Sequence, residues 1–436
     1  MTKQQFDLII EHFRSSIPEF LQTIEESRAL RKHIEFEKDY VFELRDGRPV
    51  SFPNSLRSVL KFEWSENTYH QLLNNPKFLP KDSLLIELIN SNQPMFKSAV
   101  KAIVHDRKDM LSWVEKACSK RLRGDPLSFL VEAPIKGAGL VEQSVEFESG
   151  SIKVKLRQPD LEDLRSFSAG MFFPHSDFPG MFAVIEFPIR DPSRNGHIGS
   201  ELDVLLWILT LVGRGSVVSS ENTFASEDFS TYHGMSTSRP TNSPKFFHAL
   251  TKEKTEALAT SYGVLRENIM RKDFGTQTIS PLTVAFTRYQ DSVFEDSLQK
   301  RIASAIMGLE ALFTKKGPDL SYSLRMRTSA FSRLIGGDDL RELIKTAYDI
   351  RSDYAHGGIQ AQKLETKMRD KYKSDVSPLV VDILRRAILF NVLADLDPKP
   401  GHVDEFQRLL DDTMMDSSAA RQVIQKCHQP YKALFL

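Results

Sequence analysis

The feature that most constrains the fold is a change of apolar pattern near residue 280, after which helical segments follow one another along the chain. Ser292 and Glu295 have the spacing of a capping box and are expected to open the first of these helices. Apolar residues then recur at helical spacing at Leu298, Ile302, Ala305, Ile306, Leu309, Leu312 and Phe313. A helix with such a stripe has to bury it against other elements. Residues 280–436 are therefore predicted to form a helical bundle.

Glycines, prolines and capping residues divide this region into helices with short connections. Gly317-Pro318 ends the first helix, and Gly357-Gly358 ends the third at a position typical of a C-cap. The further helices are predicted over 320–335, from Asp338 or Asp339 to 357, and from Ser377-Pro378 to Leu396. Short connections between amphipathic helices favour an antiparallel bundle.

The first 280 residues mix helix and strand patterns. Residues 1–35 and 55–125 are mostly helical, and Pro18 is expected to interrupt the first helix. Asp46-Gly47 lies between alternating segments, which predicts a hairpin over residues 40–52. Ser149-Gly150 predicts a second hairpin over residues 145–156. These patterns indicate a mixed α/β region before the bundle.

Three further segments precede the bundle. Phe182–Ile189 is a predicted strand, and Pro188 favours an edge position because proline has no N–H for a second neighbour. Glu201–Val212 is a predicted buried helix. Residues 213–245 are rich in serine, threonine, asparagine and glycine, which is typical of a long loop. The overall fold class is therefore expected to be α+β, mainly α, with regions 1–135, 136–279 and 280–436.

Composition excludes several classes of protein. A chain of 436 residues that is 41% hydrophobic and 27% charged can bury a substantial core, which excludes wholesale disorder. Lys+Arg and Asp+Glu both number 58, so the chain is not a polycation that coats nucleic acid by charge alone. Cys118 and Cys427 are too few for a disulfide framework. With no signal-peptide pattern, and with Val204–Val212 too short to span a bilayer, we expect a cytoplasmic protein without a membrane partner.

The residues best suited to chemistry lie at the end of the third predicted helix of the bundle, where Arg351 and His356 are separated by four residues. A guanidinium offers a rigid set of donors to phosphate oxygens, and an imidazole can transfer protons near neutral pH. The chain has no Cys-x-x-Cys, His-Glu-x-x-His or phosphate-loop motif, and His402-Val403-Asp404-Glu405 is interpreted as a solvated helix start. We therefore expect no metal and no cofactor.

The C-terminal region resembles the HEPN superfamily of helical-bundle proteins, and within it the Apea-like branch. The resemblance rests on three short stretches, Met307–Phe313, Arg327-Thr328-Ser329 and Tyr348–Gly358. It covers about residues 280–400. The serine at position 352, directly after Arg351, is similar to the residue found there in Apea-like members. Many active HEPN proteins have Asn, Asp or His at this position.

The resemblance implies a metal-independent endoribonuclease in which two copies pair and their Arg-x4-6-His motifs build one composite site. It implies Arg351 and His356 as catalytic residues, with RNA as substrate and a homodimer formed through the bundle. Apea-like proteins are associated with bacterial defence against phage. The N-terminal region would then sense a trigger, such as a phage-derived component or a nucleotide, or hold the nuclease in check.

Other residues near the motif are candidates for supporting roles. Ser352, Asp353, Tyr354 and Glu310 could orient the pair or contact RNA, and Lys363, Lys367 and Arg369 could follow an RNA backbone. Five positions on a helix amount to about 140° and 7.5 Å. One helix therefore does not direct both side chains at one phosphate, which independently favours a dimer.

Structural interpretations of the same residues stay open. Arg351 could be an interhelical ion-pair partner of Glu310, and His356 could cap a helix end. The lysine-rich stretch could be a solvated helix face. The competing functions are an RNA-cleaving effector, a non-catalytic module that dimerises and binds RNA, a nucleotide or a protein, and a scaffold without a ligand.

Overall fold

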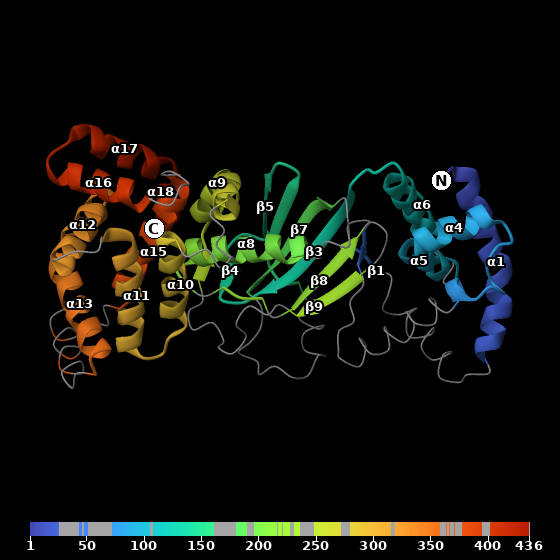
Figure 1. The fold of residues 1–436 in the computed structure, drawn as a ribbon, viewed down its shortest axis with the longest axis horizontal. Helices are drawn as coiled ribbons and strands as arrows, with labels where there is room; N and C mark the ends of the chain where they lie inside the picture. Colours follow the sequence, from blue (N-terminus) through green and yellow to red (C-terminus); the bar gives the residue numbers. More distant parts are fainter. Residues whose placement is uncertain are drawn as a thin grey trace.

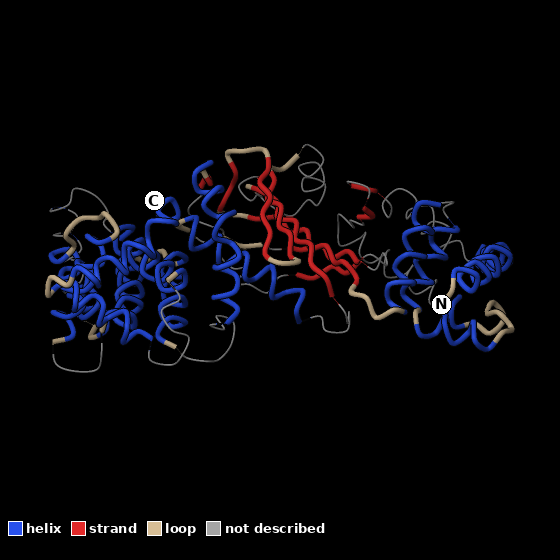
Figure 2. Tube along the Cα trace, turned by 90° about the horizontal axis from the view of Figure 1, so that it is seen from above, coloured by secondary structure: helices blue, strands red, loops and turns tan. Residues whose placement is uncertain are grey.

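The structure is a computed structural model. It describes residues 1–25, 43–45, 48–50, 72–104, 108–160, 180–189, 196–215, 217–219, 221–226, 231–235, 248–271, 280–314, 319–357, 363, 366, 370, 377–394 and 402–435. Helices lie at both ends of an elongated molecule and a sheet lies between them (Figures 1 and 2). The fold is α+β and mainly α, as predicted. No helix in the described part of the chain is long and apolar enough to cross a membrane.

The N-terminal end consists of helices α1 (Lys3–Glu25), α4 (Ser83–Ser91), α5 (Gln93–Val104) and α6 (Lys108–Leu122). Phe6 and Phe13 of α1 pack on Phe96 of α5, with ring centroids 6.2 and 6.4 Å apart. Pro18 lies inside α1 and does not interrupt it, contrary to the prediction. Phe13 and Ile17, which precede Pro18, are buried and hold this part of the helix in place.

Strands β1 (Glu43–Arg45) and β2 (Arg48–Val50) pair antiparallel, which confirms the first predicted hairpin. The second is also confirmed. Strands β5 (Ser144–Ser149) and β6 (Ile152–Arg157) pair antiparallel, and Ser149 lies opposite Ile152 next to the turn. Gly150 in the turn between them has a φ of +60°, which glycine adopts without strain.

The central sheet has six antiparallel strands in the order β5-β6-β7-β3-β8-β9. Besides the second hairpin it contains β3 (Leu127–Ile135), β7 (Met181–Ile189), β8 (Glu221–Ser226) and β9 (Thr231–Met235). The short strands β4 (Ala138–Leu140) and β10 (His248–Leu250) form a separate parallel pair. The sheet therefore joins segments from residue 127 to residue 235.

Strand β7 exists as predicted, but it is internal rather than an edge strand. Its pairing with β6 ends at Glu186, so Pro188 has a neighbour only in β3, opposite Ser128. The missing N–H of Pro188 therefore interrupts no ladder on the β6 side. A proline near a strand end marks a local edge and not the position of the whole strand.

One other prediction about this region is wrong. The segment 213–245 contains β8 and β9, so it is not one long loop. The boundary expected between residues 135 and 136 coincides with the end of β3, which pairs with β7 and β8 in the middle of the sheet. Polar strands such as β8 and β9 carry little alternation, and the pairing of β8 with β3 and of β9 with β8 determines their conformation.

Two helices pack close to the sheet, α8 (Gly196–Gly213) and α9 (Lys252–Arg271). α8 contains the predicted buried helix, and most of its described side chains are buried. Tyr262 of α9 stacks at 4.7 Å on Phe147 of β5. Arg266 of α9 binds both carboxylate oxygens of Glu201 of α8, at 2.9 and 2.6 Å.

The C-terminal end is a group of packed helices (Figure 1). They are α10 (Pro281–Phe294), α11 (Leu298–Phe313), α12 (Leu320–Leu334), α13 (Arg341–Ala355), α15 (Ser377–Leu393), α16 (His402–Met414), α17 (Ser418–His428), the 3-10 turn η2 (Gln429–Tyr431) and α18 (Lys432–Phe435). The rings of Phe313, Phe331, Phe390 and Phe406 meet at centroid distances of 5.3 to 5.9 Å. The helical character of this region is therefore confirmed.

One predicted helix start is wrong. Ser292 does not open α11, since it is buried near the end of α10 and its hydroxyl donates to the carbonyl of Tyr289. Ser297 caps α11 instead, and Glu295 accepts a hydrogen bond from its N–H at 3.0 Å. Ser280 and Thr283 form a capping box at the start of α10. Both serines precede helical patterns, so local sequence did not distinguish them.

Candidate functional site

Arg351 and His356 lie in the last turns of α13, which packs on α11 and α12. Ile344, Ala347 and Ile350 of this helix are fully buried and fix its orientation. The helix ends as predicted, with His356 at the C-cap and Gly357 next to it at a φ of +66°. The backbone N–H of His356 donates to the carbonyl of Ser352 at 3.1 Å.

The Arg351 guanidinium is held by Glu310 of α11. Its Nη2 donates to Oε2 of Glu310 at 3.0 Å, and the two side chains are 27% and 16% exposed. The guanidinium also lies 5.9 Å from the ring centroid of Tyr348, one turn earlier. Its Nε is buried and has no hydrogen-bond partner among the described residues. The ion pair that sequence analysis left open as a structural role for Arg351 is therefore present.

The Glu310 carboxylate is partly removed from water between the helices. Burial raises its pKa above the ordinary value, and the charge and hydrogen bond of Arg351 offset only part of that effect. Half-burial strengthens the pair relative to one in water, while desolvation reduces its net stabilisation. Glu310 therefore fixes the orientation of the guanidinium more than it stabilises the fold.

The His356 side chain is exposed, in contrast to Arg351. Ser352 and Asp353 are half-buried and Tyr354 is exposed, so all three lie where a ligand at the end of α13 could reach them. The helix C-terminus thus presents an accessible imidazole beside a guanidinium that is partly covered. Of the predicted supporting residues, Ser352, Asp353 and Tyr354 lie on the same helix end as the pair, and Glu310 lies on α11.

The predicted RNA-binding lysines are described only in part. Lys363 is exposed, whereas Lys367 and Arg369 lie outside the described residues. Tyr348 packs against the hydrophobic core.

The stretch Arg327-Thr328-Ser329, which carries part of the family resemblance, has structural contacts. Arg327 of α12 binds both carboxylate oxygens of Asp411 of α16 at 2.7 Å and the carbonyl of Phe313 at 2.8 Å. It therefore joins three helices. A bidentate guanidinium of this kind stabilises by geometry as well as charge.

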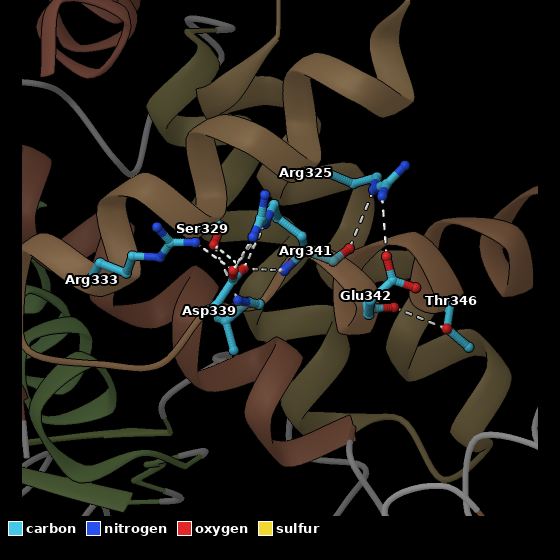
Figure 3. Close-up of polar contacts among 8 residues, drawn as sticks. Arg325, Ser329, Arg333, Asp339, Arg341, Glu342 and Thr346 are labelled. Atoms are coloured by element: carbon cyan, nitrogen blue, oxygen red, sulfur yellow. Dashed lines mark hydrogen bonds and ion pairs between the residues drawn. The ribbon is translucent and has the colours of Figure 1, made fainter. Parts of the chain in front are cut away.

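Ser329 connects α12 to the start of α13 through Asp339 (Figure 3). Asp339 accepts hydrogen bonds from Ser329 at 2.6 Å and from the backbone of Arg341 at 3.1 Å, and it also binds the Arg333 and Arg341 side chains. The side chains of Arg341 and Ser329 hold the pKa of Asp339 well below its usual range. The prediction that Asp338 or Asp339 caps this helix is wrong, because Leu340 is at the N-cap and Asp339 lies just before it.

Sequence analysis missed a second polar cluster, centred on Asp382 of α15. Three guanidiniums bind this carboxylate, those of Arg385 at 2.8 Å, Arg386 at 2.7 Å and Arg214 at 3.4 Å. Arg385 is fully buried. The available signal was the presence of Asp382, Arg385 and Arg386 in a helix that is otherwise almost wholly apolar.

Metal ligands are not gathered anywhere in the described part of the chain, where no three His, Cys, Asp or Glu side chains could hold an ion together. His402 begins α16, and Glu405 forms an ion pair with Arg408 at 3.9 Å.

Comparison of the chain with models of protein families, with characterised proteins and with solved structures gives no match. The family resemblance therefore rests on the three short stretches of the bundle, and the function has to be argued from the site itself.

Proposed function

We propose that this protein is a metal-independent endoribonuclease whose active site combines Arg351 and His356 from two copies of the bundle. The observation that carries the proposal is the end of α13, where an exposed imidazole lies one and a half turns from a guanidinium with a buried, unpartnered Nε. A helix that separates the two side chains by about 140° needs a second copy to complete one site. The resemblance to HEPN proteins supports the same arrangement.

The chemistry requires two functions that these residues can supply. In RNA the 2′-OH can attack the adjacent phosphate, provided that protons move and charge on the phosphorane is stabilised. An imidazole serves as general base or acid near neutral pH. A guanidinium that is oriented in advance stabilises the developing charge without a metal. Glu310 provides that orientation through its 3.0 Å contact with Arg351.

The rest of the chain is proposed to regulate this activity. The region before residue 280, with the N-terminal helices and the sheet, makes up well over half of the sequence, and Arg351, His356 and Glu310 lie outside it. As in the family that the bundle resembles, they would sense a trigger or restrain the nuclease, in a cytoplasmic protein of bacterial defence against phage.

A second candidate is a non-catalytic module that dimerises and binds RNA, a nucleotide or a protein. The observation in its favour is the Arg351–Glu310 ion pair, which neutralises the charge that a phosphate would otherwise attract. In this case Arg351 joins α13 to α11, and His356 is a surface residue.

The test is cleavage of RNA by the full-length protein in the presence of EDTA. Wild type is compared with Arg351→Ala, His356→Ala and the control Arg408→Ala, which removes an exposed arginine elsewhere in the bundle. We expect wild type and the control to cleave, and each site variant to lose at least 100-fold in rate, the size of a general acid–base contribution. Folding and dimerisation of each variant are checked by circular dichroism and ultracentrifugation.

Three outcomes separate the candidates. Loss of cleavage in both site variants, with folding intact, supports the nuclease. Equal cleavage by all four proteins indicates contamination and contradicts the site assignment. RNA binding without cleavage, which weakens in the site variants, favours the binding module.

A further inference from the structure

The Asp382 cluster contains more positive than negative charge. Burial lowers the pKa of Lys254, and the nearby positive charges of Arg385, Arg214 and Arg386 lower it further. Asp382 is the nearby carboxylate and acts in the opposite direction. Burial opposes the ionisation of Asp382, yet the three guanidiniums outweigh it and hold its pKa below the ordinary value. Four cations thus surround one carboxylate.

Arg385 is the structural member of the cluster. Besides Asp382, it donates to the carbonyls of Leu211 at 2.7 Å, Leu434 at 3.0 Å and Phe435 at 3.1 Å. It therefore ties α15 to the end of α8 and to α18. With these contacts made, this buried guanidinium is committed to the fold.

The other members are accessible or lack partners. The Arg214 and Arg386 side chains are 38% and 21% exposed, and Lys254 is half-buried. Among the described residues the Lys254 ammonium forms no hydrogen bond or ion pair. Nε2 of His248 is buried without a partner, and the ring lies near Lys254 and the backbone of Arg214. Glu253 is adjacent in sequence, but it is exposed and bonds Thr251 and its own backbone.

We propose that this cluster binds a phosphate-type oxyanion, held between Arg214 and Lys254 with Arg386 beside it. Partly buried cations that share a single carboxylate repel one another, and an oxyanion relieves the repulsion. A phosphate with two negative charges offsets two of the three surplus positive charges and accepts hydrogen bonds from the fork of a guanidinium. Lys254 is the third residue of α9, so the positive end of that helix dipole adds to the attraction.

The cluster lies where the sheet region meets the bundle. Arg214 follows α8, His248 is in β10, Lys254 is in α9, and the rest is in α15, which contacts both α8 and α9. A bound oxyanion would connect these elements through one ligand. The ligand class is a free phosphate or the phosphoryl group of a small molecule, and the proposal stands whether or not the bundle cleaves RNA.

The experiment is isothermal titration calorimetry of the full chain with inorganic phosphate and, separately, with AMP, at constant ionic strength in a buffer without oxyanions. The variants are Lys254→Met, Lys254→Arg and Lys252→Met, an exposed lysine on the same helix. We expect wild type, Lys254→Arg and Lys252→Met to bind phosphate, and Lys254→Met to bind at least 10-fold more weakly. Lys254 has no partner to lose, so Lys254→Met should fold.

Tighter binding of AMP than of phosphate, also weakened in Lys254→Met, would identify a nucleotide as the source of the phosphoryl group. Equal affinity would point to free phosphate. The proposal is wrong when neither probe binds wild type, or when Lys254→Met binds as well as Lys254→Arg.

Discussion

At the scale of single residues, the two polar sites of this protein differ in what burial does to their charges. Glu310 and Arg351 form a pair of opposite charges, so Arg351 stabilises the ionised form of Glu310 against part of the effect of burial. Lys254 lies among guanidiniums and has no such partner among the described residues. The first site is therefore arranged in advance, and the second contains an unfavourable interaction that a ligand can remove.

The stability of the fold should depend on pH through Lys254. Burial and the neighbouring Arg385 and Arg214 lower the pKa of Lys254 from 10.5 to about 8. Between these values the unfolded chain holds the proton and the folded chain does not, so stability rises with pH across that window. Lys254→Met lacks the charge, and its advantage in unfolding free energy over wild type should shrink between pH 8 and 10.5.

Urea denaturation at pH 7, 8, 9 and 10 measures this difference. Lys252→Met on the same helix is the control for loss of a lysine without the cluster. The groups that face Lys254 are Asp382, Arg385 and Arg386 of α15, with Arg214 and His248. An advantage of Lys254→Met that stays constant over this range would contradict the environment assigned to Lys254.

At the scale of helices and strands, close packing distinguishes positions that look alike in sequence. Gly308 and Gly263 both lie inside helices, α11 and α9. A Cβ on Gly308 would lie 2.7 Å from a methyl of the fully buried Leu384, whereas one on Gly263 would meet only Ser149 at 3.5 Å. A side chain at position 308 would therefore require Leu384 of α15 to shift.

Alanine at these two positions should have opposite effects. Gly308→Ala is expected to destabilise by about 1–2 kcal/mol, because overpacking outweighs the gain in helix propensity. Gly263→Ala should stabilise by about 0.5–1 kcal/mol, because only the propensity changes. Thermal or urea unfolding of both variants measures the difference. Stabilisation by Gly308→Ala would show that Leu384 has room to move.

At the scale of the whole molecule, the proposed function depends on two copies. If Arg351 of one copy works with His356 of the other, a mixture of Arg351→Ala and His356→Ala should regain cleavage. Half of the dimers in an equal mixture are mixed, and each contains one of the two Arg–His pairs, so about a quarter of wild-type activity is expected. The RNA cleavage assay measures this after subunits are exchanged by brief mild denaturation. Each variant is treated alone in parallel, and a mixture as inactive as its components would assign the pair to a single copy.

Local patterns in the sequence determined a large part of this molecule. Helical stripes and glycine stops placed α11, α12, α13 and α15, and alternation around Ser149-Gly150 placed β5 and β6. They also indicated that Arg351 and His356 lie at the end of a helix that Gly357 terminates. These features depend on residues a few positions apart, so their physical causes are present in a short stretch of chain.

Only the tertiary structure decided which segments meet. It placed β7 inside the sheet, paired the polar segment β8 with β3 and β9 with β8, and brought Arg214 and Lys254 near Asp382. It also brought Arg351 and Glu310 together as an ion pair, which the sequence had left as one possibility. The free energy of these contacts comes from burial and charge shared between distant segments, and no single stretch of sequence contains it.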